Sequence, residues 1–190
     1  MFETDTPSIQ AKTPFPIPHS LIVLGLGSNL GDSHSIVINA VKVLGDVLRE
    51  LRRASLYETE PLYYVDQGRF INTAVAGFYG VNQKPLEAAR ELLVQLHKIE
   101  ERFGRKRDKE RRWGERFLDV DILLFGDLTI NESDIIIPHP RLKERRFALE
   151  PLLEIMPDAT EPGTGLSYRS ICQALPDQGV KRLPSLSEKR

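Results

Sequence analysis

The order of strand and helix patterns along the chain restricts its fold more than any other feature of the sequence. Strands are predicted at 21–27, 53–58, 70–78 and 119–125, and helices at 33–44 and 85–104. Read in order, the pattern is strand, helix, strand, strand, helix and strand, which is the split βαββαβ arrangement of ferredoxin-like folds. We therefore predict an α+β domain in which helices pack on an antiparallel sheet.

Composition favours one domain, at 21–176, between two tails. The chain has 190 residues, and its 41% hydrophobic and 28% charged content is that of an ordinary globular protein. Residues 1–20 contain four prolines among polar residues and are predicted to form a flexible tail, and 177–190 a polar tail that frays. We find no signal peptide and no membrane segment, and the single cysteine allows no internal disulfide, so we expect a cytoplasmic protein without a membrane partner.

Two carboxylates open the predicted strand at 119–125. Because side chains alternate along a strand, Asp119 and Asp121 point to one face, with their Cα atoms about 6.5 to 7 Å apart. Magnesium commonly uses one or two carboxylates and completes its shell with water and substrate phosphates, which the arginines of 102–116 would also hold. The pair predicts phosphoryl chemistry. The alternative is a solvated strand end whose acids pair with Arg112 or Arg116.

The glycine-rich turn at 25–32 matches neither of two nucleotide-binding fingerprints. A Walker loop requires lysine and then serine or threonine after its last glycine, but Gly31 is followed by Asp32. The dinucleotide pattern requires glycine where this chain has Leu30. We predict instead that Asp32 or Ser33 caps the helix that follows.

Five motifs together resemble the 6-hydroxymethyl-7,8-dihydropterin pyrophosphokinases of folate biosynthesis. They are GLGSNLG at 25–31, YETEPL at 57–62, FIN at 70–72, RWGERFLDVD at 112–121, and IPHPR at 137–141 with RRF at 145–147. They occur in the family's order and near its spacing, between about residues 21 and 155. The resemblance implies an ATP-dependent diphosphotransferase that moves pyrophosphate from Mg-ATP to the pterin hydroxymethyl group and leaves AMP.

The resemblance also implies roles for individual residues. Two Mg²⁺ ions would bridge the ATP phosphates from Asp119 and Asp121, and Arg107, Arg112 and Arg116 would complete the catalytic set. The pterin would stack between Phe70 and Phe147 and hydrogen-bond Asn72. Its remaining contacts would be Thr59, Leu62 and Trp113, the first two through backbone groups. The ATP site would comprise Glu100, Arg105, Arg107, Arg112, Trp113, Arg116, Ile122, His139 and Arg145.

Several of these residues also have plainer interpretations. Phe70 and Phe147 can be core aromatics, and His139 between two prolines can be a turn residue. Asn72 is different, because asparagine is disfavoured inside a strand and usually has a polar reason to be there. The chain departs from the family pattern, mainly in the expected adenosine contacts, at Glu60, Phe70, His97, Asp134, Ile136 and Pro140, and in a segment at 104–113 that is one residue longer.

A competing hypothesis is a single-stranded RNA-binding domain, since basic residues surround Trp113 in a chain of ferredoxin-like pattern. The aromatic signature of RNA-recognition strands is missing, and Asp119 and Asp121 would repel phosphates without a metal. We therefore expect ATP and the pterin as partners, no nucleic acid, and a monomer. Residues 104–114, with glycines at both ends and almost no apolar side chains, are predicted to form a lid over the substrates.

Overall fold

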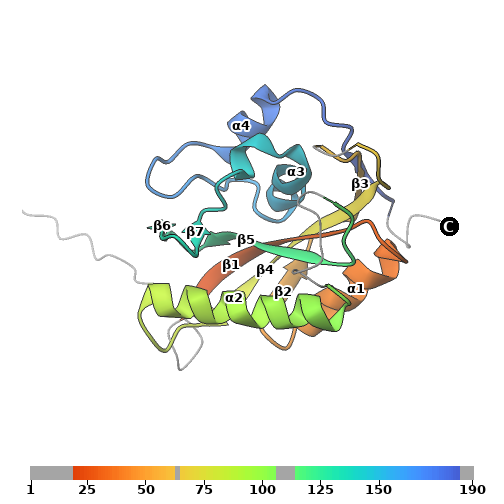
Figure 1. Ribbon diagram of the computed structural model, residues 1–190. Coiled ribbons are helices and arrows are strands. Elements are labelled where there is room, and N and C mark those ends of the chain that lie inside the picture. The colour runs from red at the N-terminus through yellow and green to blue at the C-terminus, as the bar shows by residue number, and fades with distance from the viewer. Residues whose placement is uncertain (1–18, 63–64, 106–113, 185–190) are drawn as a thin grey trace, which may run out of the picture.

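The structure, a computed structural model, describes residues 19–62, 65–105 and 114–184 (Figure 1). Its main sheet has six strands: β1 (His19–Ser28), β2 (Arg49–Arg53), β3 (Tyr57–Thr59), β4 (Phe70–Gly80), β5 (Asp119–Phe125) and β8 (Lys181–Arg182). The order is β5-β1-β4-β3-β8, and β2 pairs with β4 farther along the same edge as β3. Strand β1 is antiparallel to both of its neighbours, β5 and β4, and β2 and β3 are antiparallel to β4, so the predicted antiparallel sheet is confirmed.

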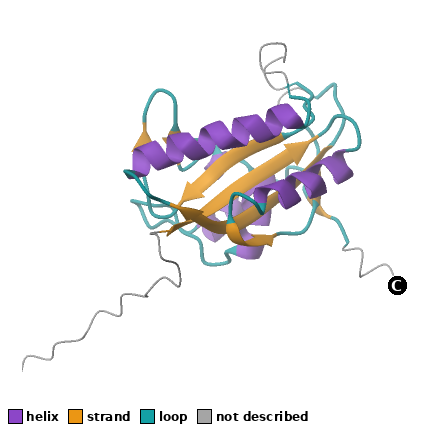
Figure 2. Ribbon diagram, turned by 90° about the horizontal axis from the view of Figure 1, so that it is seen from below, coloured by secondary structure: helices purple, strands orange, loops and turns teal. Residues whose placement is uncertain are grey.

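Helices cover both faces of this sheet (Figures 1 and 2). The pair α1 (Ser33–Leu44) and α2 (Pro85–Arg102) lies on one face, and α3 (Arg146–Ile155) with the short α4 (Tyr168–Ala174) lies on the other. Each helix buries one apolar stripe, such as Leu92 and Leu96 of α2 and Leu149 and Leu152 of α3. Two apolar clusters result, one on each side of the sheet. The predicted α+β class with packed helices is therefore confirmed.

The ends of α1 follow the local signals of the sequence. Asp32 is the N-cap, and its carboxylate accepts a hydrogen bond from the Ser35 backbone at 3.1 Å. Gly45 follows the last turn. The helix presents Val37, Ala40 and Leu44 to the sheet, in agreement with the predicted spacing.

The strand predicted at 53–58 is wrong, because the chain forms β2 and β3 with a break at 54–56. Tertiary contacts occupy the backbone groups at this break. The Thr73 hydroxyl bonds to the carbonyl oxygens of Ala54 and Ser55, at 3.1 and 2.9 Å. The Ser55 N–H donates to the carboxylate of Glu154 on α3 at 3.0 Å. A continuous ladder would require those groups, so the strand divides.

The C-terminal segment is more ordered than the expected fraying from Asp177 onward. Residues 181 and 182 form β8, which pairs with Glu58 and Tyr57 of β3, and Leu183 packs against the core. The short helix η1 (Leu142–Glu144) and the hairpin of β6 (Ile130–Asn131) and β7 (Ile136–Ile137) complete the elements.

Two predictions fall largely on residues outside the described ranges, namely the flexible tail at 1–20 and the lid at 104–114. Across the described part of the chain, no helix combines the length and the apolar character needed to cross a bilayer.

Candidate active site

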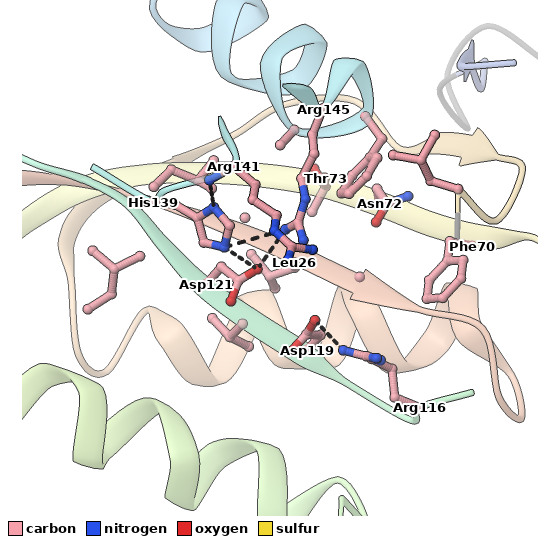
Figure 3. A pocket seen from close by; sticks show the side chains of 18 of the residues that line it. Leu26, Phe70, Asn72, Thr73, Arg116, Asp119, Asp121, His139, Arg141 and Arg145 are labelled. Carbon is pink, nitrogen blue, oxygen red and sulfur yellow. Dashed lines mark hydrogen bonds and ion pairs between the residues drawn. The ribbon is translucent and has the colours of Figure 1, made fainter. Parts of the chain in front are cut away.

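A cavity of about 610 Å³ lies on the sheet face that carries α3 (Figure 3). This volume is within the usual range for small-molecule sites. Strands β1, β4 and β5 form its floor, and the start of α3, β7 and the segments near 60 and 140 form its walls. Most of the predicted site residues line it, namely Thr59, Leu62, Phe70, Asn72, Arg105, Arg116, Asp119, Asp121, Ile122, His139, Arg145 and Phe147.

Strand register places the polar groups of the floor in a row. Gly27 on β1 pairs with Asn72 on one side and with Asp119 on the other, and Gly25 pairs with Asp121. Because neighbouring strands are about 4.8 Å apart, the backbones at Asn72 and Asp119 are separated by about 10 Å. A Cβ atom at Gly27 would lie 2.6 Å from the Asn72 Oδ1, so the absence of a side chain there keeps this part of the floor open.

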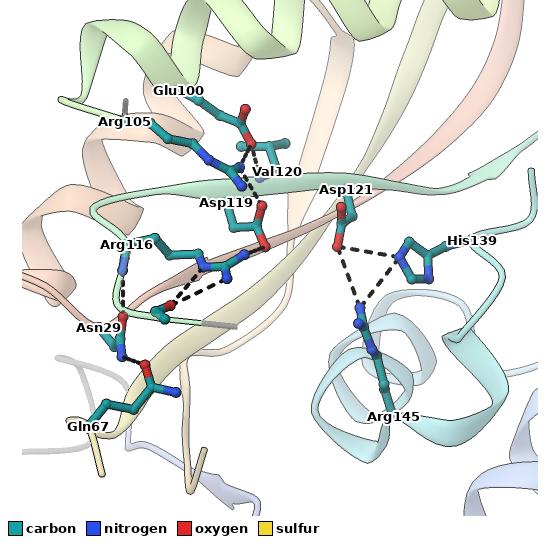
Figure 4. A network of polar contacts seen from close by, with 11 residues as sticks. Asn29, Gln67, Glu100, Arg105, Arg116, Asp119, Val120, Asp121, His139 and Arg145 are labelled. Carbon is teal, nitrogen blue, oxygen red and sulfur yellow. Dashed lines mark hydrogen bonds and ion pairs between the residues drawn. The ribbon is translucent and has the colours of Figure 1, made fainter. Parts of the chain in front are cut away.

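Asp119 is held by two arginines (Figure 4). Its Oδ1 accepts from Arg105 at 2.5 Å, and its Oδ2 accepts from Arg116 at 2.8 Å. Burial opposes ionisation of this carboxyl, but the charges and hydrogen bonds of Arg116 and Arg105 outweigh burial and lower the pKa of Asp119. Asp119 is therefore a carboxylate at neutral pH.

Asp121 lies in a different electrostatic environment from Asp119. Burial and the negative charge of Asp119 raise the pKa of Asp121 above its usual range, although Arg145 opposes the shift. Its Oδ2 lies 3.7 Å from the Arg145 Nη1 and 3.7 Å from the His139 Nε2. The two acids repel each other across a surface that faces the cavity, which is where an added cation would be stabilised.

His139 is neutral, and both of its ring nitrogens have polar neighbours. Burial and the charge of Arg145 lower the pKa of His139 to about 4. Its Nδ1 accepts the Arg141 backbone N–H at 3.1 Å, which favours the neutral tautomer with its proton on Nε2, the nitrogen that lies 3.7 Å from Asp121 and 3.4 Å from the Arg145 Nη1. The ring thus offers an N–H donor to the cavity.

At the other end of the floor, Asn72 is buried and oriented by Thr59. The Asn72 Nδ2 donates to the Thr59 hydroxyl at 2.7 Å, which leaves its Oδ1 on the side of Gly27. Phe70 and Phe147 are only partly buried and both line the cavity, so neither is simply a core residue. This end can recognise a flat ring with hydrogen-bonding edges.

Two carboxylates without further acidic or thiol ligands suit one class of metal. In the part of the chain that the structure describes, no three His, Cys, Asp or Glu side chains gather as a metal site. Zinc sites require three or four such ligands, whereas Mg²⁺ needs only one or two carboxylates when substrate phosphates supply the rest. Asp119 and Asp121 therefore fit Mg²⁺ that arrives with a phosphate ligand.

Three comparisons bear on what this cavity binds. Over residues 23–157 the sequence matches the 7,8-dihydro-6-hydroxymethylpterin-pyrophosphokinase (HPPK) family. A 2-amino-4-hydroxy-6-hydroxymethyldihydropteridine pyrophosphokinase of Bacillus subtilis is 38% identical over 148 residues, which are 77% of this chain and 84% of the relative. This chain belongs to the HPPK family. It is accordingly a pyrophosphokinase of folate biosynthesis, which decides between the two hypotheses in favour of the enzyme.

Other relatives of this HPPK chain differ in length. The Aquifex aeolicus pyrophosphokinase is 36% identical, with 74% of this chain and 83% of the relative covered. The folic acid synthesis protein fol1 of Pneumocystis carinii is 33% identical over 90% of this chain, which spans only 22% of that longer protein. A Plasmodium falciparum HPPK-DHPS crystal structure has a TM-score of 0.66 at 16% identity, covering 90% of this chain and 48% of that one, and it supports the fold alone.

Not every predicted HPPK site residue lies in the cavity lining. Glu100 is fully buried behind β5, where its carboxylate accepts from the Val120 N–H at 2.8 Å and pairs with Arg105, so it supports the site from behind (Figure 4). Ile122 borders the cavity, but its side chain belongs to the core under the sheet. Arg107, Arg112 and Trp113 lie outside the described residues.

Sequence analysis missed Asn29, which lies beside the cavity and holds two distant segments together through hydrogen bonds. Asn29 accepts the Arg116 N–H at 2.9 Å and donates to the Gln67 side chain and the Gly68 carbonyl at 3.1 and 3.2 Å. It joins the segment before Phe70 to the one before Asp119 (Figure 4). Its place in the GLGSNLG motif of the β1–α1 turn does not reveal this role, because those partners are 38 or more residues away in the sequence.

Proposed function

We propose that this HPPK transfers the terminal pyrophosphoryl group of Mg-ATP to the hydroxymethyl oxygen of 6-hydroxymethyl-7,8-dihydropterin. The products are the pterin diphosphate and AMP. In this proposal the pterin occupies the end of the cavity near Asn72, and the ATP phosphates lie over Asp119 and Asp121.

One observation carries the assignment of the two ends. Asn72, Gly27 and Asp119 occupy neighbouring register positions on three adjacent strands. This row supports a ring-binding end and a phosphate-binding end about two strand spacings apart, with no side chain between them at Gly27. A hydroxymethyl group projecting from the ring would cross that gap toward the phosphates.

At the pterin end, the residues act by recognition. The Asn72 Oδ1 would accept from an amino group of the ring edge, because the bond from Nδ2 to Thr59 orients the carboxamide with this oxygen on the side of Gly27. Phe70 and Phe147 would cover the ring faces, with the Arg145 guanidinium 5.5 Å from the centroid of the Phe147 ring.

At the phosphate end, the residues supply charge. Asp119 and Asp121 would hold two Mg²⁺ ions, which when bound contribute positive charge at the attacking and leaving oxygens. Arg105, Arg116 and Arg145 would contact phosphate oxygens, since guanidinium groups form charge-assisted hydrogen bonds with them. The neutral His139 would offer its Nε2–H without adding a charge.

The transfer is an in-line displacement at the β-phosphorus of ATP. The hydroxymethyl oxygen forms a bond to this phosphorus and releases its proton to water, while the bond from the β-phosphorus to the α–β bridging oxygen breaks. AMP leaves with the bridging oxygen. The two phosphates that remain together are now attached to the pterin.

Product analysis tests the proposal directly. The protein is mixed with Mg-ATP and the reduced hydroxymethylpterin, and nucleotides are separated by chromatography. We expect AMP in a one-to-one ratio with pterin diphosphate. The matched control is the same reduced pterin with a methyl group in place of hydroxymethyl, which lacks the acceptor oxygen and should give no AMP. Formation of ADP, or AMP without the acceptor, would contradict the proposal.

A further inference from the structure

The first turn of α3 forms one wall of the cavity, yet its own residues do not cap it. Arg145, Phe147 and Ala148 line the cavity at this turn. The N-cap position is Arg145, whose side chain makes no hydrogen bond to the backbone of the turn. The start of a helix leaves backbone N–H groups without partners in the helix, and a side-chain acceptor usually satisfies one of them.

The acceptor comes from Gln178, near the C-terminal end of the described chain. The Gln178 Oε1 accepts the Arg146 backbone N–H at 2.9 Å, and its Nε2 donates to the Glu144 carbonyl at 2.8 Å. One carboxamide thus bridges the last residue of η1 and the first residue of α3. Arg145 lies between these two fixed points, with its side chain directed at Asp121 and His139 (Figure 4).

Further contacts hold Gln178 in place. The Arg146 guanidinium donates to the Leu175 carbonyl at 3.1 Å, just before this segment. After it, the Leu183 N–H donates to the Leu56 carbonyl at 2.8 Å, and β8 pairs with β3. Between these anchors, a Cβ at Gly179 would lie 3.0 Å from the Glu60 Cγ. The segment therefore contacts the chain next to both Phe147 and Thr59, two residues that line the cavity.

We propose that Gln178 is a positioning residue of the active site, which caps α3 from outside and so sets where Arg145 and Phe147 project into the cavity. Gln178 lies beyond residues 23–157, over which the family match extends, so family membership assigns it no role. The inference rests on the proposed function, since Arg145 and Phe147 are taken as phosphate and pterin contacts.

The test compares Gln178→Ala with Gln173→Ala, a matched truncation of an exposed glutamine on α4. Three quantities are measured on the full chain: exchange of the Arg146 amide, the dissociation constant of the reduced pterin in the presence of an unreactive ATP analogue, and kcat. We expect Gln178→Ala to speed exchange at Arg146 and to weaken pterin binding about fivefold, the ratio that corresponds to a typical helix cap. Gln173→Ala should match wild type in all three.

A third variant, Gln178→Glu, separates positioning from a loss of general stability. Its carboxylate keeps an acceptor for the Arg146 N–H, at a helix end that favours negative charge, but it replaces the donor to the Glu144 carbonyl by an oxygen, which that carbonyl repels. We expect it to restore part of the Arg146 protection and of the pterin affinity that Gln178→Ala loses.

Several results would overturn the inference. Pterin affinity and kcat in Gln178→Ala equal to those of Gln173→Ala would do so, even with a lower melting temperature, because Gln178 would then be structural only. Equal losses in Gln178→Glu and Gln178→Ala would also do so. Failure of wild type to form AMP would instead refute the proposed function and leave the exchange of the Arg146 amide as a separate result.

Discussion

Replacing Gly27 by alanine tests whether the absence of a side chain at this strand position leaves Asn72 free to bind the pterin. The backbone at Gly27 is that of an ordinary strand, so alanine itself introduces no backbone strain there. Its Cβ, however, would lie 2.6 Å from the Asn72 Oδ1, where real Cβ atoms essentially never approach. Asn72 cannot turn away freely because its Nδ2 donates to Thr59 at 2.7 Å. We expect the carboxamide to be displaced from its ligand-binding orientation.

The expected loss of pterin affinity in Gly27→Ala can be calculated from the hydrogen bonds of the buried Asn72 carboxamide. Leaving a buried polar group without its partner costs about 1 to 3 kcal/mol. That range corresponds to about a 5-fold to 150-fold weaker dissociation constant for the pterin. ATP binding should change little, because the nearest acid, Asp119, lies on the other side of Gly27 and is held by Arg105 and Arg116.

The assay is calorimetric titration with the reduced pterin, in the presence of an unreactive ATP analogue, for Gly27→Ala, Asn72→Ala and the double variant. Asn72→Ala should weaken pterin binding by a similar factor and spare ATP. Because Asn72→Ala removes the atom that Cβ would strike, Gly27→Ala should cost little more in that background. An equal loss in both backgrounds would refute the reasoning, since Cβ would then obstruct the ligand itself. Melting temperatures serve as the folding control.

The remaining predictions concern the acids. Asp119→Asn and Asp121→Asn should each lower kcat by orders of magnitude at saturating Mg²⁺, and near-normal turnover in either would contradict the metal assignment. Urea denaturation near pH 7 should give opposite results for these two variants. Asp119→Asn should lower the free energy of unfolding, because Arg105 loses a charged partner. Asp121→Asn should leave it unchanged or raise it, because this substitution removes a carboxylate whose ionisation is opposed by burial and by the charge of Asp119, as its raised pKa shows. Glu154→Gln should cost about 1 to 3 kcal/mol of unfolding free energy near pH 7, because this carboxylate accepts from Ser55 and from the Tyr57 hydroxyl. Burial opposes ionisation of Glu154, but these hydrogen bonds lower its pKa, so its contribution exists above the unfolded pKa of about 4.3 and is lost as the pH falls through the folded value. The wild-type advantage over Glu154→Gln should therefore shrink in acid, and a pH-independent difference would show that the carboxylate charge is not involved.

Sequence alone determined the features that depend on local periodicity. The stripe of α2, a cap at Asp32 or Ser33 and the common face of Asp119 and Asp121 all follow from residues that are neighbours in the chain, and the structure selects Asp32 as the cap. The order of these elements was enough to predict the sheet and its packed helices, and the motif resemblance indicated most of the cavity lining.

Only the tertiary structure decided features that depend on distant partners. The break at 54–56 arises because Thr73 and Glu154 take backbone groups that a continuous strand would use. Glu100 lies beside the apolar stripe of α2 in the sequence pattern, and only the packing of α2 under β5 turns its carboxylate toward the Val120 N–H. Gln178 caps a helix that begins 32 residues earlier. No short-range pattern encodes such contacts, because they form between segments that the chain brings together only on folding.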